Sequence, residues 1–196
     1  MYLYGASGHA KVIIDILKAS GQPIEGLIDD DKSVRELSGY PVFHEKGMFS
    51  PVIVSIGDNK TRKRISENLS ADFGKAIYPG AIVSDSVLVG EGSVVMQGVV
   101  IQASAVVGKH CIVNTGASID HECVIGDYVH ISPHSALCGN VVVGEGTWIG
   151  VGSVALPGVK IGKWSIVGAG SVVCRDIPDG VLAVGNRCRV IKKLIV

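Results

Sequence analysis

The chain lacks an excess of charge of either sign. Lysine and arginine together number 18, aspartate and glutamate together also number 18, and aromatic residues make up only 5% of the sequence. Proteins that bind nucleic acids usually present a basic stripe interleaved with aromatic side chains. No such stripe occurs, so a nucleic acid is not an expected partner.

Long apolar runs are missing as well. No stretch reaches the roughly 18 apolar residues that indicate a membrane-spanning helix. Met1 leads directly into a predicted strand and not into a secretory signal. We therefore expect no membrane insertion and a cytoplasmic location.

Paired cysteine motifs are also absent. The five cysteines are odd in number and contain no CxxC spacing. A disulfide framework needs pairs, and a thiolate zinc site needs closely spaced ligands. We expect reduced, mostly packed thiols and no metal.

The sequence does contain an uninterrupted six-residue period. A period of six fits neither an amphipathic helix nor a two-faced strand, but it fits a prism in which three short strands make one coil of about 18 residues. Gly90, Gly108, Gly126, Gly144 and Gly162 lie 18 residues apart, and we predict that they occupy a corner that needs freedom from side-chain constraint. The pattern predicts a parallel β-helix over residues 77–178. An aliphatic residue or alanine fills each of its seventeen positions: Ile77, Val83, Val89, Val95, Ile101, Val107, Val113, Ile119, Ile125, Ile131, Leu137, Val143, Ile149, Ala155, Ile161, Val167 and Val173.

Residues 1–72 are predicted to form a small Rossmann-like α/β domain, and residues 179–196 a C-terminal tail. Strands are expected at 1–4, 24–28 and 52–56, and helices at 10–20 and 60–69. This order predicts a parallel sheet with binding loops at the carboxyl ends of its strands. The backbone N–H groups of the turn from Gly5 to His9 would bind a phosphate, and the Asp29 carboxylate would bind a ribose hydroxyl. A plain structural turn is the alternative, because GASGHA is not the full GxGxxG motif.

His121 is the candidate general base, since histidine exchanges protons near neutral pH. It stands two residues after Ile119 and so outside the inward-facing register. If one coil takes about 18 residues, Gly139 lies over His121 and Asn140 over Glu122. A base with a backbone N–H one coil away suits acyl transfer, because the N–H would stabilise a developing oxyanion. Glu122 or Asp120 would orient the ring, and a solvated histidine is the alternative.

Several segments together resemble a known family over essentially the full length of the chain. They are YGASGHAKV, the Asp29-Asp30 pair, SIGDNKTR, NTGASIDHECVIGDYVHIS and CGNVVVG. The sequence resembles the bacterial nucleotide-4-aminosugar N-acetyltransferases of the bacillosamine type and their sialic acid O-acetyltransferase relatives. The resemblance implies a left-handed β-helix and a homotrimer, with acetyl-CoA between neighbouring subunits and a UDP-sugar on the leading domain. The tail departs from the family, because Val184 to Arg189 lacks the proline of the usual G-x-P-A-K pattern.

The resemblance also implies roles for individual residues. His121 would be the general base and Glu122 its partner. The acetyl-CoA contacts would be His130, Gly139, Val151 and Ala169, and the nucleotide-sugar contacts Ser7, Gly8, His9, Asp29, Asp30 and Gly57.

These observations favour acetyl transfer to the 4-amino group of a UDP-linked deoxy-aminosugar by direct attack. No cysteine or serine has an evident activating base, which argues against a covalent enzyme intermediate. Alternatives are O-acetylation of a sialic acid type of sugar and N-acetylation of a GDP-linked aminosugar. A metal lyase like the β-helical carbonic anhydrases would instead use His121, His130 and His134 as ligands.

Overall fold

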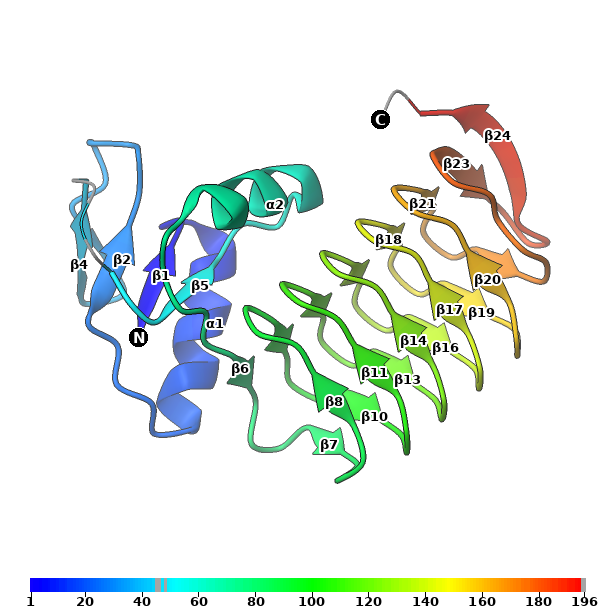
Figure 1. Ribbon diagram of the computed structural model, residues 1–196, viewed down its shortest axis with the longest axis horizontal. Helices are drawn as coiled ribbons and strands as arrows, with labels where there is room; N and C mark the ends of the chain where they lie inside the picture. The colour runs from blue at the N-terminus through cyan, green and yellow to red at the C-terminus, as the bar shows by residue number, and fades with distance from the viewer. Residues whose placement is uncertain (45–46, 48, 195–196) are drawn as a thin grey trace.

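A small α/β region leads a long parallel β-helix, as Figure 1 shows for the computed structural model. The structure describes residues 1–44, 47 and 49–194. The leading region lies at one end of the β-helix, and the chain finishes in a hairpin at the other end (Figure 1). Among the described residues, no helix is both long and apolar enough to cross a membrane.

The leading region is built on a five-stranded sheet. β1 (Tyr2–Tyr4) pairs in parallel with β2 (Gly26–Ile28) on one side and with β5 (Val52–Val54) on the other, so the carboxyl ends of these strands share one edge. The predicted β-α-β order is confirmed. A hairpin of β3 (Glu36–Leu37) and β4 (Tyr40–Phe43), which the sequence pattern did not predict, extends the sheet beyond β2. The order is β3, β4, β2, β1 and β5.

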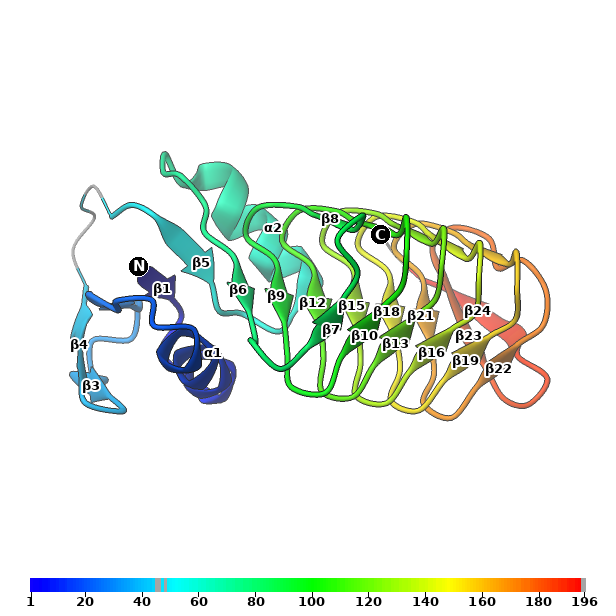
Figure 2. The ribbon, with the colours of Figure 1, turned by 90° about the horizontal axis from the view of Figure 1, so that it is seen from below.

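Two helices, α1 (Gly8–Ala19) and α2 (Asn59–Asn68), cover opposite faces of this sheet (Figure 2). The apolar residues of α1 recur at helical spacing and are buried against Leu3, Leu27 and Ile53. Asp58 caps the start of α2, because its carboxylate accepts a hydrogen bond from the Thr61 N–H at 2.8 Å. Its buried residues are polar, so α2 is held by hydrogen bonds and not by an apolar stripe.

Among the described residues, seventeen two-residue strands wind into three parallel sheets, and each residue of the predicted six-residue period is the second residue of one strand. From Val95 onward these residues are buried inside the prism. The periodic prediction is therefore confirmed. Sheet A contains β6 (Ala76–Ile77), β9 (Val94–Val95), β12 (Ile112–Val113), β15 (His130–Ile131), β18 (Trp148–Ile149) and β21 (Ile166–Val167). Sheet B contains β7 (Ile82–Val83), β10 (Val100–Ile101), β13 (Ser118–Ile119), β16 (Ala136–Leu137), β19 (Val154–Ala155) and β22 (Val172–Val173). Sheet C contains β8 (Leu88–Val89), β11 (Val106–Val107), β14 (Val124–Ile125), β17 (Val142–Val143) and β20 (Lys160–Ile161).

The glycines that recur every 18 residues serve a purpose other than the predicted one. Their φ values lie outside the left-handed region, whereas every sixth residue from Gly92 to Gly170 has a φ between 52° and 73°. A Cβ at Gly90 would lie 2.6 Å from the carbonyl carbon of Gly108 in the next coil. These glycines are therefore required because adjacent coils approach too closely for a side chain.

The tail forms an antiparallel hairpin, β23 (Val181–Val184) with β24 (Arg189–Lys193), which extends sheet A. The residues of β24 are exposed. The chain turns from sheet A to sheet B at corner A–B, from sheet B to sheet C at corner B–C, and from sheet C back to sheet A at corner C–A.

Arg62 fastens α2 to the β-helix. It is 1% exposed, and its guanidinium donates to the carbonyl oxygens of His110 and Tyr128 at corner C–A. It also donates to the carbonyl oxygens of Ile56 and Gly57 in the leading region. Burial lowers the pKa of Arg62 to about 10. The side chain thus ties both parts of the chain through their backbones.

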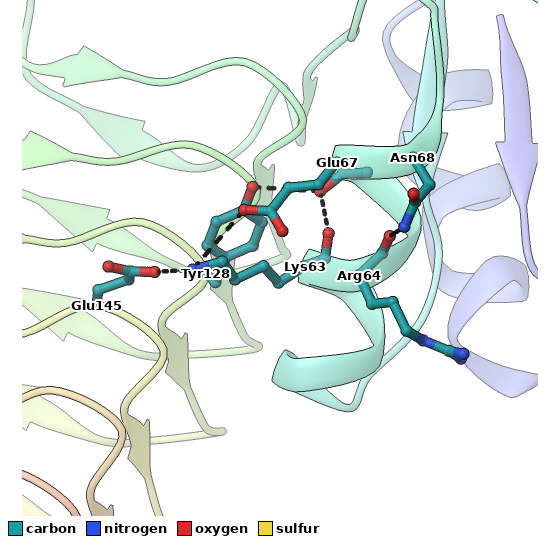
Figure 3. A network of polar contacts seen from close by, with 7 residues as sticks. Lys63, Arg64, Glu67, Asn68, Tyr128 and Glu145 are labelled. Atoms are coloured by element: carbon teal, nitrogen blue, oxygen red, sulfur yellow. Dashed lines mark hydrogen bonds and ion pairs between the residues drawn. The ribbon is translucent and has the colours of Figure 1, made fainter. Parts of the chain in front are cut away.

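A second set of contacts on α2 reaches the same corner (Figure 3). The Lys63 ammonium pairs with Glu145 at 2.5 Å and lies over the Tyr128 ring. Together with α1, which packs on Ala76, Val94 and Ile112, these contacts place the leading region over sheet A.

Candidate active site

His121 and Glu122 form a pair at corner B–C. The Nδ1 atom of His121 lies 3.1 Å from Oε2 of Glu122, and both side chains are more than half exposed, at 54% and 59%. The two residues sit in the turn between β13 and β14, and Glu122 has a left-handed φ of 59°. Because consecutive residues of a turn need not point to opposite faces, the ring and the carboxylate can meet.

The hydrogen bond between His121 and Glu122 determines which ring nitrogen of His121 can accept a proton. A Glu122 carboxylate that accepts from Nδ1–H leaves Nε2 without a proton and available as a base. The Asn140 side chain donates to the same carboxylate oxygen at 3.3 Å and steadies it. Asp120, the other candidate partner, accepts from the backbone N–H of His121 at 2.8 Å. The structure therefore pairs the ring with Glu122.

Gly139 faces the ring from the next coil, where the 18-residue spacing places it. A Cβ at this position would lie 2.6 Å from Nε2 and 2.5 Å from Cε1 of His121, so a side chain here would displace the ring. Within the described residues, the Gly139 N–H makes no hydrogen bond. The exposed imidazole therefore lies against a buried glycine whose N–H has no hydrogen-bond partner in the described part of the chain.

A second group of polar residues lies on sheet A, beneath the leading region. His130 continues the outward ladder of Val94 and Ile112, and its ring stacks on Trp148 at 5.5 Å between centroids. Asn114 Nδ2 lies 3.1 Å from His130 Nε2. The Nδ1 atom of His130 and Nε2 of His9 are buried and have no hydrogen-bond partner in the described part of the chain.

Both histidines of this second group are kept neutral by their surroundings. Burial, followed by the charge of Arg62, lowers the pKa of His130 to about 3 and that of His9 to about 4. At neutral pH each ring offers one N–H donor and one acceptor.

The structure does not bring all the predicted site residues together in one chain. His121, Glu122 and Gly139 lie at corner B–C, which is opposite sheet A and hence opposite His130 and the leading region. Val151 and Ala169 are exposed at the third corner, A–B. His134 also lies at corner A–B, so the three histidines of the metal-lyase alternative stand on three different parts of the prism. Within residues 1–44, 47 and 49–194, no group of three His, Cys, Asp or Glu side chains is arranged to hold a metal.

The predicted nucleotide-sugar residues gather at the carboxyl edge of the leading sheet. Ser7 precedes α1 but makes no side-chain cap, and the first turn of α1 holds no acidic residue. The N–H groups of that turn are therefore open to an anion. Ser7, Gly8, Asp30 and Gly57 are exposed there, and His9 is half-buried.

Asp29 has a bracing contact that the sequence did not reveal. Its carboxylate accepts from the Ala6 N–H at 2.6 Å and from the Asp31 N–H at 2.9 Å. It thereby holds the loop after β1 against the loop after β2. Asp30, by contrast, reaches the Tyr4 hydroxyl at 3.2 Å and lines a cleft of about 500 Å³ between α2 and the sheet.

Comparison with known proteins identifies both parts of the chain. A family model described as the PglD N-terminal domain matches residues 1–69, and one described as bacterial transferase hexapeptide (six repeats) matches residues 140–175. An uncharacterized protein of Acanthamoeba polyphaga mimivirus is 33% identical over 97 residues, which are 46% of this chain. The chain spans only 20% of the length of that relative.

Two solved structures are similar over nearly the whole chain. Perosamine N-acetyltransferase from Caulobacter crescentus, a histidine-to-asparagine variant in complex with CoA and GDP-perosamine, is 41% identical with a TM-score of 0.92. The match covers 98% of this chain and 96% of that one. The acetyltransferase domain of PglB from Neisseria gonorrhoeae, in complex with acetyl coenzyme A, is 35% identical with a TM-score of 0.89. That match covers 97% of this chain and 98% of the other.

Proposed function

This chain belongs to the hexapeptide-repeat nucleotide-aminosugar N-acetyltransferases that carry a PglD-type leading domain, and we propose that it transfers the acetyl group of acetyl-CoA to the 4-amino group of a nucleotide-linked deoxy-aminosugar. The observation that carries the proposal is the exposed His121 ring, held by Glu122 and faced by Gly139. Such an arrangement suits a general base that works beside an oxyanion donor.

The proposed reaction is direct attack of the amine on the thioester. The amine nitrogen bonds to the carbonyl carbon while His121 Nε2 takes a proton from the nitrogen. The negative charge that develops on the carbonyl oxygen is stabilised by the Gly139 N–H. When the carbon–sulfur bond breaks, the proton passes from His121 to the departing thiolate. Glu122 keeps the ring oriented and stabilises the imidazolium throughout.

The acceptor is proposed to bind on the leading region. The open N-terminal turn of α1, with Ser7 and Gly8, suits its diphosphate. Asp30 and Gly57 are exposed at the same edge, and His9 is half-buried in the first turn of α1. The sequence motifs imply a UDP-linked sugar, and the perosamine N-acetyltransferase holds a GDP-linked one. Both nucleotides therefore belong in the acceptor test.

The site is proposed to be shared between chains of a cyclic homotrimer. In one chain the base corner and the acceptor region lie on opposite sides of the prism, so the reacting groups need a neighbour to meet. Sheet C presents an outward ladder of Leu88, Val106 and Val124, which are 67%, 38% and 45% exposed. Burial of these apolar side chains between neighbouring chains would stabilise the trimer. Gly139 of one subunit and Val151 and Ala169 of another would then line the path of acetyl-CoA.

The purified protein tests the proposal when it is incubated with acetyl-CoA and, in separate reactions, with a GDP-linked 4-aminosugar, a UDP-linked 4-aminosugar and a sialic acid. Mass spectrometry should show an acetylated aminosugar and no acetylated sialic acid. His121→Ala should lower kcat by about 10² to 10⁴ while acetyl-CoA binding and the melting temperature are kept. A variant that keeps more than about a third of the wild-type kcat would remove His121 from the general-base role.

A further inference from the structure

The terminal hairpin closes the far end of the prism, and its connecting segment pairs with β22, the last strand of sheet B. The Val172 N–H donates to the Gly185 carbonyl oxygen at 3.1 Å, and the Cys188 N–H donates to the Val172 carbonyl oxygen at 2.8 Å. Val172 and Asn186 form a parallel bridge. Because the hairpin also extends sheet A, the tail is held on two of the three sheets.

This pairing brings two cysteines to neighbouring positions. Cys174 follows β22 at corner B–C, and Cys188 lies in the tail segment that departs from the family pattern. Both stand two residues beyond the bridge between Val172 and Asn186. The Cys174 thiol donates to the Val172 carbonyl oxygen at 3.5 Å, and the same oxygen accepts the Cys188 N–H. The thiol of one cysteine therefore lies beside the backbone of the other.

The spacing of the two segments suits a disulfide. Neighbouring strands of a sheet lie about 4.8 Å apart, and disulfides join residues whose Cα atoms are about 4.4–6.8 Å apart. Cys138, which is also half-buried, occupies the same corner as Cys174 but two coils earlier. Twice the strand spacing exceeds the reach of a disulfide, so Cys138 is too far from Cys174 to pair with it.

The surroundings of the two thiols suit stepwise oxidation. Both side chains are half-buried, so a small oxidant can reach them. Cys188 packs against the core of the β-helix, and burial raises its pKa. Since the thiolate is the reactive form of cysteine, Cys188 is a poor first nucleophile at neutral pH. The first attack on an oxidant therefore falls to Cys174.

We propose that Cys174 and Cys188 form a reversible disulfide when the protein meets a hydroperoxide, and that this bond fastens the tail to the last coil of the β-helix. Both thiols are free in the structure, which is therefore that of the reduced form. Disulfides that form in reducing compartments are usually transient and redox-sensing. The inference does not rest on the proposed function, because neither cysteine takes part in the proposed acetyl transfer.

The oxidation proceeds in two balanced steps. The Cys174 thiolate attacks one oxygen of the peroxide, the O–O bond breaks, and the leaving oxygen takes up a proton as water or an alcohol; Cys174 becomes a sulfenic acid. The Cys188 thiolate then attacks that sulfur, the S–O bond breaks, and the leaving hydroxide takes up a proton as water. Two thiols thereby lose two electrons to the peroxide. A dithiol reductant reverses the reaction by thiol–disulfide exchange.

Thiol counting and peptide mapping of the full-length protein test the inference. The reduced protein is treated with hydrogen peroxide, and the remaining thiols are alkylated after denaturation. The count of free thiols should fall from five to three. Tryptic digestion without reductant should yield residues 164–175 joined to residues 188–189, and dithiothreitol should separate the two peptides.

Two serine variants provide the controls. Cys188→Ser should give no cross-linked peptide and should leave on Cys174 a sulfenic acid that dimedone traps. Cys138→Ser is the matched control, because it removes another half-buried thiol from the same corner, and it should form the cross-link to the same extent as the wild type. The disulfide closes a loop of about 15 residues, so oxidation should raise the Tm of the wild-type protein by about 5–10 °C. Peroxide should not raise the Tm of Cys188→Ser.

The outcomes separate the pairing from its effect. An unchanged thiol count would overturn the proposal, and so would the loss of thiols to sulfinic acid, to other cysteine pairs or to bonds between chains. A cross-link that forms without raising the Tm would overturn the fastening of the tail, while the modification site would stand.

Discussion

Gly139→Ala probes the catalytic corner with the smallest possible change. The added methyl group would lie 2.6 Å from Nε2 of His121 and 2.5 Å from Cε1. Carbon atoms in contact ordinarily stand about 3.5 to 4.0 Å apart, so the imidazole must retreat by about 1 Å. A displacement of that size at a reacting group lowers kcat by about 10²-fold.

Stability should change far less than activity. The His121 side chain is 54% exposed and can rotate into solvent, and the φ of Gly139 lies outside the left-handed region. The free energy of unfolding should therefore stay within about 1 kcal/mol of the wild-type value. Steady-state kinetics should show the loss in kcat with little change in the KM for acetyl-CoA, and denaturant titration measures the stability.

Gly108→Ala is the matched control. Its methyl group would lie 2.7 Å from the Asp127 backbone nitrogen and 2.8 Å from the carbonyl carbon of Gly126, which cannot swing away. This variant should lose about 1–3 kcal/mol of stability, as overpacked cores do. If Gly139→Ala instead retains wild-type kcat within threefold, or loses as much stability as Gly108→Ala, the proposed role of this corner is wrong.

Three further perturbations test other parts of the molecule. Arg62→Met should lower the free energy of unfolding by about 3–5 kcal/mol, because several buried carbonyl groups would lose their hydrogen-bond donor. Denaturant titration measures this, and a loss below about 1 kcal/mol would contradict the role of Arg62 in holding α2 on the β-helix. The pKa values of His9 and His110 are lowered from 6.5 to about 4, chiefly by burial, so protonation favours the unfolded chain. The free energy of unfolding should be flat above about pH 7 and fall between pH 6.5 and 4, by up to about 1.4 kcal/mol per pH unit for each histidine; equal stability at pH 7 and pH 5 would refute this. Val124→Glu places a charge on the outward ladder of sheet C and should give an inactive monomer in light scattering, whereas an active trimer would show that sheet C is not the interface.

The β-helix could be predicted because each coil packs only on the coils next to it, so that residue spacing alone determines which side chains meet. Each aliphatic residue from Ile77 to Val173 must face inward once three strands close a coil, and the spacing of one coil fixes which residues stack. The same spacing predicts that Gly139 lies over His121, and the structure confirms it. The predicted role of the recurring glycines was wrong, because sequence spacing does not reveal how closely the backbones of adjacent coils approach.

The separation of His121 from His130 across the prism also follows from the sequence spacing. His121 and His130 are nine residues apart, which is half a coil, and residues half a coil apart lie on opposite sides of the prism. No pattern in the sequence predicted the hydrogen bonds of Arg62 or those of Asp29. They depend on how the leading region docks on sheet A, and a short polar helix gives no apolar pattern from which docking can be inferred.

Complementation between inactive variants tests most directly whether each site draws on two chains. His121→Ala should disable the base corner. His130→Ala should disable the opposite side of the prism, because His130 is the proposed acetyl-CoA contact that lies on sheet A beneath the leading region. If the two variants are unfolded together in equal amounts and refolded, about a quarter of the subunit interfaces will pair an intact base corner with an intact acceptor side. The account predicts recovery of about a quarter of wild-type activity in that mixture. Activity no higher than that of either variant alone, in a mixture shown to contain mixed trimers, would contradict it.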